Sequence, residues 1–148
     1  MRISGFSDVC LRSMMRLGLA GEAGMTSRDL AQAIHVPYTH VTKAVVRLRE
    51  LGLVNTSRGR GGGLRLTDAA SEVTVGWLMR RLEPRPDPID CDNPAAPCPL
   101  RHACNLRTAL RRAQEEFLRS LDGVKIADLF GPPTSSLLLQ IDPGSPHA

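Results

Sequence analysis

The sequence feature that most limits how this chain can fold is a proline-rich stretch that also contains three of its four cysteines. Six prolines fall between Pro84 and Pro99, and proline lacks a backbone N–H and disfavours helical angles in the residue before it. Cys91, Cys98 and Cys104 are separated there by six and five residues. Packing does not require thiols to be neighbours, whereas the ligands of a metal or cluster must converge on one point. The stretch therefore predicts a loop that binds an inorganic cofactor.

Composition narrows the class of protein. A length of 148 residues suits one domain, or a small domain with an appendage, and the net charge of +4 favours a polyanionic partner. No stretch approaches the roughly 20 apolar residues of a membrane span, and the start does not read as a signal peptide. We therefore expect a cytoplasmic protein without a membrane partner, in which clustered thiols stay reduced and bind metal.

The first third of the chain has the periodicity of short helices. Helical spacing predicts helices over residues 7–19, 26–34 and 38–51, with Ser7 as the N-cap of the first and Thr26 or Ser27 as that of the second. The residue before Pro37 avoids helical angles, so a tight turn is expected between the second and third helices. Two short helices joined by a turn are typical of a helix-turn-helix, which reads the major groove of DNA.

A hairpin is predicted to follow. Residues 53–56 and 64–66 are expected as two short strands, and the glycine run over residues 58–63 as their turn. Between residues 38 and 66 there are six basic residues against one acidic residue, Glu50, so positive charge is concentrated where a recognition helix and a wing would meet DNA. The predicted DNA-contacting residues are Ser27, Arg28, Tyr38, Thr39, His40, Thr42, Lys43, Arg47, Arg58 and Arg60.

The remaining sequence predicts a further helix or helix pair over residues 67–83 and a long helix over residues 99–121. Apolar residues recur along the long helix at spacings of three and four, so we expect it to pair with its twin in a homodimer. The predicted divisions are a DNA-binding domain over residues 1–83, a cysteine loop over 84–98, a dimerisation segment over 99–130 and a loosely ordered tail over 131–148.

The chain resembles the Rrf2 family of winged-helix transcription regulators, and within it the NsrR subgroup of nitric-oxide-sensing repressors. The matching motifs are FSDVCLRSMMRL, VPYTHVTKAVVRLRELGLV, RGRGGGLRLT, VGWLMRRLE, CDNPAAPCPLRHAC and IADLF. The resemblance implies a mainly α fold, a winged helix-turn-helix with a small two-stranded wing and a long dimerisation helix. It also implies a repressor that binds a palindromic operator as a homodimer, controlled by an iron–sulfur cluster that senses nitric oxide.

The same resemblance implies a ligand set. Cys91, Cys98 and Cys104 would bind the cluster together with Asp8 of the partner subunit, and [4Fe–4S] is favoured over [2Fe–2S]. Regulators of the IscR type use a histidine three residues after the last cysteine, and Arg107 occupies that position here. An intact cluster would then tie the first helix of one subunit to the cysteine loop of the other, and nitric oxide would break that tie.

Other interpretations stay open at this stage. His102 with the three cysteines would make a zinc site, and Asp90, Asp92 and His102 are fallback fourth ligands. A regulator that senses redox state or cluster supply, and an electron-transfer or thiol-redox protein, are alternative functions. Cys10 is predicted to be an ordinary core residue. The sequence shows no nucleophile–base pair, so we do not expect an enzyme.

Overall fold

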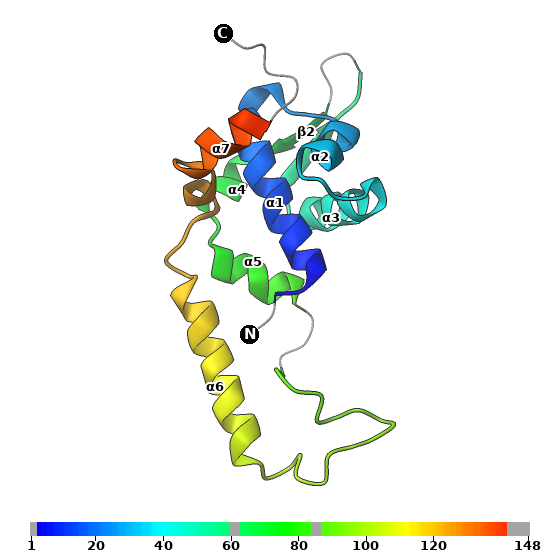
Figure 1. Ribbon diagram of the computed structural model, residues 1–148, viewed down its shortest axis with the longest axis vertical. Coiled ribbons are helices and arrows are strands. Elements are labelled where there is room, and N and C mark those ends of the chain that lie inside the picture. Colours follow the sequence, from blue (N-terminus) through cyan, green and yellow to red (C-terminus); the bar gives the residue numbers. More distant parts are fainter. Residues whose placement is uncertain (1–2, 60–62, 84–86, 142–148) are drawn as a thin grey trace. The chain divides into compact units, whose positions relative to one another are not determined.

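The computed structural model describes residues 3–59, 63–83 and 87–141, and they form two compact units (Figure 1). The winged unit contains Ser4–Val73 and the segment that begins at Lys125. The cysteine unit contains Thr74–Val124 together with the first residues of the chain. Within the described residues, no helix is long and apolar enough to span a membrane.

The winged unit holds the predicted helix-turn-helix and wing, and most of the fold prediction is confirmed there. Its elements are α1 (Gly5–Ala20), η1 (Gly21–Ala23), α2 (Ser27–Ala33), α3 (Tyr38–Glu50), β1 (Val54–Ser57), β2 (Gly63–Leu66), α4 (Asp68–Glu72), η2 (Ile126–Phe130) and α7 (Thr134–Ile141). The antiparallel strands pair Val54 with Leu66 and Ser57 with Gly63. Figure 1 shows α2 and α3 beside this hairpin, and α1 packs against α2, α3, β2 and η2.

The core of the winged unit comes from apolar residues at helical spacing on α1, α2 and α3. Met14 and Leu17 of α1, Leu30 of α2, and Val41 and Leu48 of α3 have no accessible surface. Burial of such side chains is the main favourable contribution to folding. Because the apolar face of α3 packs against α1 and α2, its polar face points to solvent.

Helix α1 begins earlier than predicted. Ser4 is its N-cap, and the Ser4 Oγ accepts a hydrogen bond from the Ser7 backbone N–H at 3.2 Å. The prediction of Ser7 as the cap was wrong, because its side chain is fully buried and lies inside the first turn. The Thr26 cap of α2 is confirmed: its Oγ1 accepts from the Asp29 N–H at 3.1 Å.

The cysteine unit is built from α5 (Val75–Leu82) and α6 (Asn105–Ser120), joined by the cysteine loop, residues 87–104. The N–H groups of Val75 and Gly76 donate to the carbonyls of Val124 and Leu121, at 2.8 and 3.1 Å. A side chain at Gly76 would place its Cβ 2.6 Å from the carbonyl oxygen of Leu118. This close approach of α5 to the end of α6 therefore requires glycine.

Helix α6 begins at Asn105, six residues after the predicted start at Pro99. Residues 100–103 form turns instead, and Cys104 is the N-cap, whose Sγ accepts the Arg107 N–H at 3.4 Å. Proline tolerates the first helical position, but the N–H groups of Arg101 and Ala103 donate to the carbonyls of Cys98 and Leu100, three residues earlier, and so close separate turns. None of the side chains of α6 is buried in the single chain.

The C-terminal segment also differs from the expectation of a loosely ordered tail. Residues 134–141 form α7, which contacts η2 of the same unit. The short apolar run from Leu137 supports a helix that composition alone did not indicate.

Truncating Leu48 to alanine should lower the free energy of unfolding by about 2–5 kcal/mol, because it removes a fully buried side chain and leaves a cavity. Val46→Ala in the same helix is the matched control, because Val46 is 53% exposed. Urea unfolding of both variants and the parent checks this. Equal destabilisation by the two substitutions would contradict the assigned core face of α3.

Candidate functional site

The exposed face of α3 carries most of the side chains predicted to contact DNA. Tyr38, Thr39, His40 and Lys43 are exposed, whereas the residues between them on the opposite face form the core. An α-helix with one polar, solvent-facing side is the element that enters the major groove. The structure thus brings these four predicted residues together on one face.

Other residues predicted to contact DNA interact with side chains or carbonyls of this chain. The Arg28 guanidinium lies 5.5 Å from the centre of the Tyr38 ring, within the range of a cation–π interaction. The Thr42 hydroxyl donates to the Thr39 carbonyl at 3.0 Å, and Arg47 forms an ion pair with Glu50 at 3.1 Å. Ser27 is half-buried at the start of α2. Arg47 is therefore held by a carboxylate three residues further along the same helix.

Only part of the predicted wing lies within the described residues. Arg58 is exposed at the end of β1, where a basic side chain can grip a phosphate. Arg60, predicted with it, lies outside the described residues. The N–H of Gly63, where β2 begins, donates to the Ser57 Oγ at 3.2 Å and so closes the base of the hairpin.

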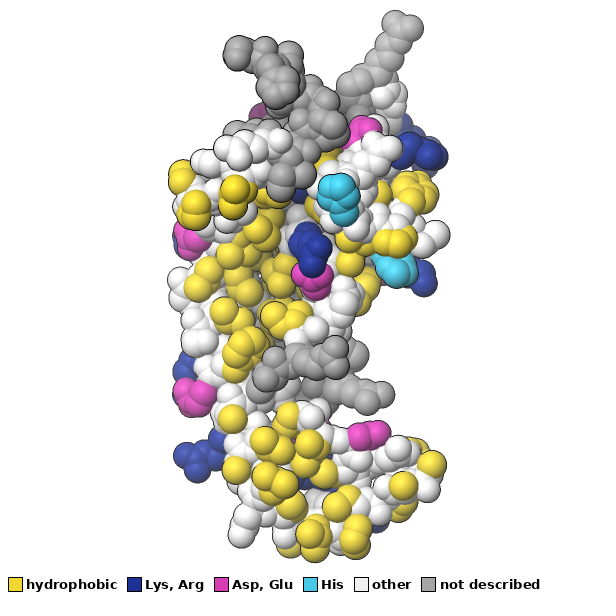
Figure 2. Space-filling model, viewed as in Figure 1, with side chains coloured by type: hydrophobic (Ala, Val, Ile, Leu, Met, Phe, Trp, Pro, Cys, Tyr) yellow, Lys and Arg dark blue, Asp and Glu magenta, His cyan; other side chains and the backbone are white. Residues whose placement is uncertain are grey.

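The cysteine loop is irregular and holds three free thiols. Cys91 is buried, Cys98 and Cys104 are half-buried, and the Cys98 N–H donates to the Cys91 carbonyl at 3.1 Å. Figure 2 shows a mainly hydrophobic and uncharged surface over this part of the chain. In the described residues, no group of three or more His, Cys, Asp or Glu side chains is close enough to hold a metal ion. The donors fit a thiolate-bound group chemically, but they have not converged.

An ion-pair network that the sequence did not predict lies near Cys91. The Arg107 Nε donates to Asp87 Oδ2 at 3.2 Å, and its Nη2 pairs with both Asp87 and Asp92. Arg111 also pairs with Asp87, with 2.6 Å between Nη2 and Oδ2. The pKa of the Asp87 carboxyl is held well below its usual range by Arg111 and then by Arg107. The paired residues are 15, 20 and 24 positions apart in the sequence, so no local pattern indicated them.

Burial raises the pKa of two cysteine thiols. It raises the pKa of the Cys91 thiol, and the nearby charge of Arg107 opposes part of this increase. Burial raises the pKa of Cys10 to about 12, so Cys10 stays a protonated thiol at neutral pH. Cys10 is fully buried in α1, in the unit that does not contain the loop, which agrees with the prediction of a core residue.

Asp8, the predicted fourth ligand, is a half-exposed residue in the first turn of α1. Its carboxylate accepts from Arg12 at 2.9 Å through Nε and at 2.8 Å through Nη2. Such a pair four residues apart stabilises a helix only slightly. Asp8 belongs to the winged unit and the three cysteines belong to the cysteine unit.

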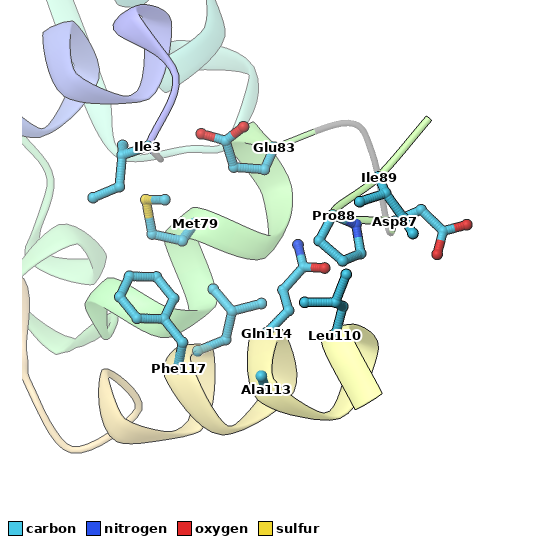
Figure 3. A pocket seen from close by; sticks show the side chains of 11 residues that line it. Ile3, Met79, Glu83, Asp87, Pro88, Ile89, Leu110, Ala113, Gln114 and Phe117 are labelled. Carbon is cyan, nitrogen blue, oxygen red and sulfur yellow. The ribbon is translucent and has the colours of Figure 1, made fainter. Parts of the chain in front are cut away.

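The cysteine unit also contains a cavity of about 500 Å³ beside α6 (Figure 3). Met79 of α5 and Leu110 and Phe117 of α6 line it, and Pro88 and Ile89 of the loop close one end. The side chain of Gln114 projects into it, and its Oε1 is buried without a hydrogen-bond donor among the residues that the structure describes. The cavity thus lies between the first segment of the cysteine loop and α6, which the ion pairs of Asp87 with Arg107 and Arg111 join.

Alkylation of the native, metal-free protein should modify Cys98 and Cys104 well before Cys10. The Cys10 thiol is inaccessible, and with a pKa of about 12 it has almost no thiolate at pH 8. Mass spectrometry of tryptic peptides after a timed iodoacetamide reaction measures the order, and denatured protein gives the reference in which all four sites react. Early labelling of Cys10 would contradict its burial.

Comparisons with known proteins agree with this fold and these residues. The sequence profile of the Rrf2 family, described as iron-dependent transcriptional regulators, matches residues 3–132. The chain is 49% identical over 141 residues to the HTH-type transcriptional repressor NsrR of Streptomyces coelicolor, covering 94% of this chain and 95% of that one. It is 35% identical to the HTH-type transcriptional regulator NsrR of Geobacillus kaustophilus, covering 87% of this chain and 89% of that one.

Among solved structures, IscR of T. potens matches with a TM-score of 0.68 at 19% identity, covering 87% of this chain and 85% of that one. A likeness at this identity bears on the fold alone, and it confirms the predicted winged helix. The profile match and the two relatives identify the family as one of transcriptional regulators and not of enzymes. The chain belongs to the Rrf2 family of transcriptional regulators.

Proposed function

We propose that this chain is a DNA-binding transcriptional repressor whose operator affinity is controlled by an iron–sulfur cluster that reacts with nitric oxide. The observation that carries the proposal is the combination of two features in one chain: a basic, exposed recognition helix and a loop with three free thiols. The similarity to repressors named NsrR over nearly the whole chain supports the same function.

In this proposal the winged unit binds the operator. Thr39, His40 and Thr42 would meet base edges, while Lys43 and Arg47, one turn apart on α3, would contact phosphates. Arg58 and Arg60 would contact DNA from the wing, and Ser27 and Arg28 from the start of α2. The stacking of Arg28 on Tyr38 supports a role for this pair, because it holds the guanidinium at the N-terminal end of α3.

The cysteine unit would hold the cluster. Cys91, Cys98 and Cys104 would supply three thiolates and Asp8 of the partner subunit the fourth ligand, with [4Fe–4S] favoured over [2Fe–2S]. Bound there, the cluster would supply iron that nitric oxide attacks, and an oxygen ligand binds iron less firmly than a thiolate does. The task of the chain is to hold the three thiols in one loop and to keep that loop seated on α6.

A homodimer would complete the molecule. None of the side chains of α6 is buried in the single chain, and Leu106, which belongs to the predicted apolar stripe, is 62% exposed. A twofold dimer presents two recognition helices, which fits a palindromic operator.

A titration with nitric oxide under anaerobic conditions tests the proposed function. The cluster-loaded protein should bind operator DNA, and nitric oxide should lower its affinity by about 5- to 150-fold, the range of a typical coupling free energy. A mild oxidant in a parallel titration separates nitric oxide sensing from redox sensing. Unchanged affinity after nitric oxide, with loss of affinity after the oxidant alone, would contradict the proposal.

Arg58→Ala should weaken operator binding and reduce the dependence of log affinity on log salt by about one phosphate contact. Arg112→Ala is the control, because Arg112 is an exposed arginine of α6, outside the winged unit, and its loss removes the same charge. Fluorescence anisotropy at several salt concentrations measures both slopes. If the two variants have the same slope, Arg58 does not contact phosphate.

Asp8→Ala should retain part of the cluster but change its absorption spectrum and its rate of reaction with nitric oxide. Arg12→Ala is the matched control, because it removes the ion pair of Asp8 and leaves the carboxylate in place. The ion pair itself contributes only about 0.3–0.5 kcal/mol, so neither variant should unfold. If Asp8→Ala matched the parent in spectrum, reactivity and operator affinity, Asp8 would not be a ligand.

A further inference from the structure

One guanidinium contacts the cysteine loop at three separate points. Arg107 pairs with Asp87, four residues before Cys91, and with Asp92, which directly follows Cys91. Its Nη1 donates to the Arg101 carbonyl at 2.9 Å, three residues before Cys104. The side chain of Arg107 thus touches the entry, the middle and the exit of the loop.

The loop has few other restraints. Within residues 87–104, the backbone hydrogen bonds that the structure shows join groups at most three residues apart, except for the bond from Cys98 to Cys91. Ordering a segment of this kind costs conformational entropy for every residue, and local turns do not fix how the two arms lie relative to each other. Contacts between distant residues must therefore set the separation of the thiols.

Arg107 is also distinct from its neighbour on α6. Its side chain is 13% exposed, whereas that of Arg111 is 50% exposed. Within the described part of the chain, the hydrogen bonds of Arg111 go to Asp87 and not to Asp92 or the Arg101 carbonyl. A planar guanidinium with five donors suits simultaneous contacts of this kind, which an ammonium group cannot reproduce.

We propose that Arg107 is a positioning residue: its guanidinium clamps the two arms of the cysteine loop and so limits how far Cys91, Cys98 and Cys104 must move to meet at one metal centre. The inference rests on the proposed function, because it takes the three thiols as the ligands. Arg107 itself binds no metal. It acts through Asp87, Asp92 and the Arg101 carbonyl, which together fix the loop before the cofactor arrives.

Hydrogen–deuterium exchange of the metal-free protein tests the clamp without any cofactor. Arg107→Gln should speed exchange in peptides that cover residues 90–103 by about tenfold or more, the factor expected when a charge-assisted hydrogen bond is lost. Arg112→Gln removes the same charge from an exposed site of α6 and should leave exchange unchanged. Arg107→Lys keeps the charge, should fold like the parent, and should give an intermediate rate.

Titration with cadmium(II) alone, a soft ion that thiolates bind, then tests the consequence for the thiols. The parent and Arg112→Gln should bind one ion per chain with a strong thiolate-to-cadmium absorption band, and Arg107→Gln should bind about tenfold more weakly. If Arg107→Gln or Arg107→Lys matches the parent in exchange or in cadmium affinity, the clamp is overturned. A parent that binds cadmium but never an iron–sulfur cluster would contradict the proposed function and leave the clamp standing.

Discussion

The cysteine loop depends on charge that is balanced inside the cysteine unit. Arg107 and Arg111 face Asp87, and Arg107 also faces Asp92, so two cations and two anions share a small, partly buried space. A charge in such a place is tolerated only when it is paired and hydrogen-bonded. The network satisfies this condition and at the same time holds the loop beside the first turns of α6, where Cys104 caps the helix. The thiols are therefore carried by a segment that has no regular structure but is tethered to a helix.

In the proposed function, the winged unit binds DNA and the cysteine unit holds the cluster. The winged unit has a conventional core of aliphatic stripes and presents α3 with its polar face outward. The cysteine unit buries side chains of α5, such as Leu78 and Met79, but none of α6 in the single chain. Asp8, the proposed fourth ligand, belongs to the winged unit, while the three cysteines belong to the other. A cluster bound by both would couple the loop to a recognition helix, which is the physical basis for the proposed control of operator affinity.

Local patterns predicted the winged unit well. The helical stripes around Leu30 and Leu48, the Thr26 cap and the hairpin at the glycine run all depend on residues close in sequence, so they can be recognised without a structure. The two helix starts that were predicted wrongly depend on burial and on contacts that local sequence does not show. Ser4 and Ser7 are both good caps, and only the burial of Ser7 decides between them. Helix α6 begins at Asn105 and not at Pro99, and its N-cap is the sulfur of Cys104, which is not among the residue types preferred at that position.

The candidate site was only partly predictable. The three cysteines stand out by their spacing, and the exposed residues of α3 follow from helical periodicity. The role of Arg107 could not be found in this way, because its partners lie 15 and 20 residues away and act through the fold. In the sequence, Arg107 stands out only because it occupies the position of a possible histidine ligand, three residues after Cys104. The fourth ligand is equally hidden from the sequence of one chain if it comes from a second copy.

Mass spectrometry of the anaerobically purified protein under non-denaturing conditions tests the central claim most directly. A single spectrum gives the mass of the assembled protein together with its bound inorganic atoms. The account predicts the mass of a dimer with added iron and inorganic sulfide on each chain, and the loss of that added mass when Cys98 is replaced by alanine. A dimer or monomer that carries zinc, or no inorganic atoms after cluster reconstitution, would contradict it.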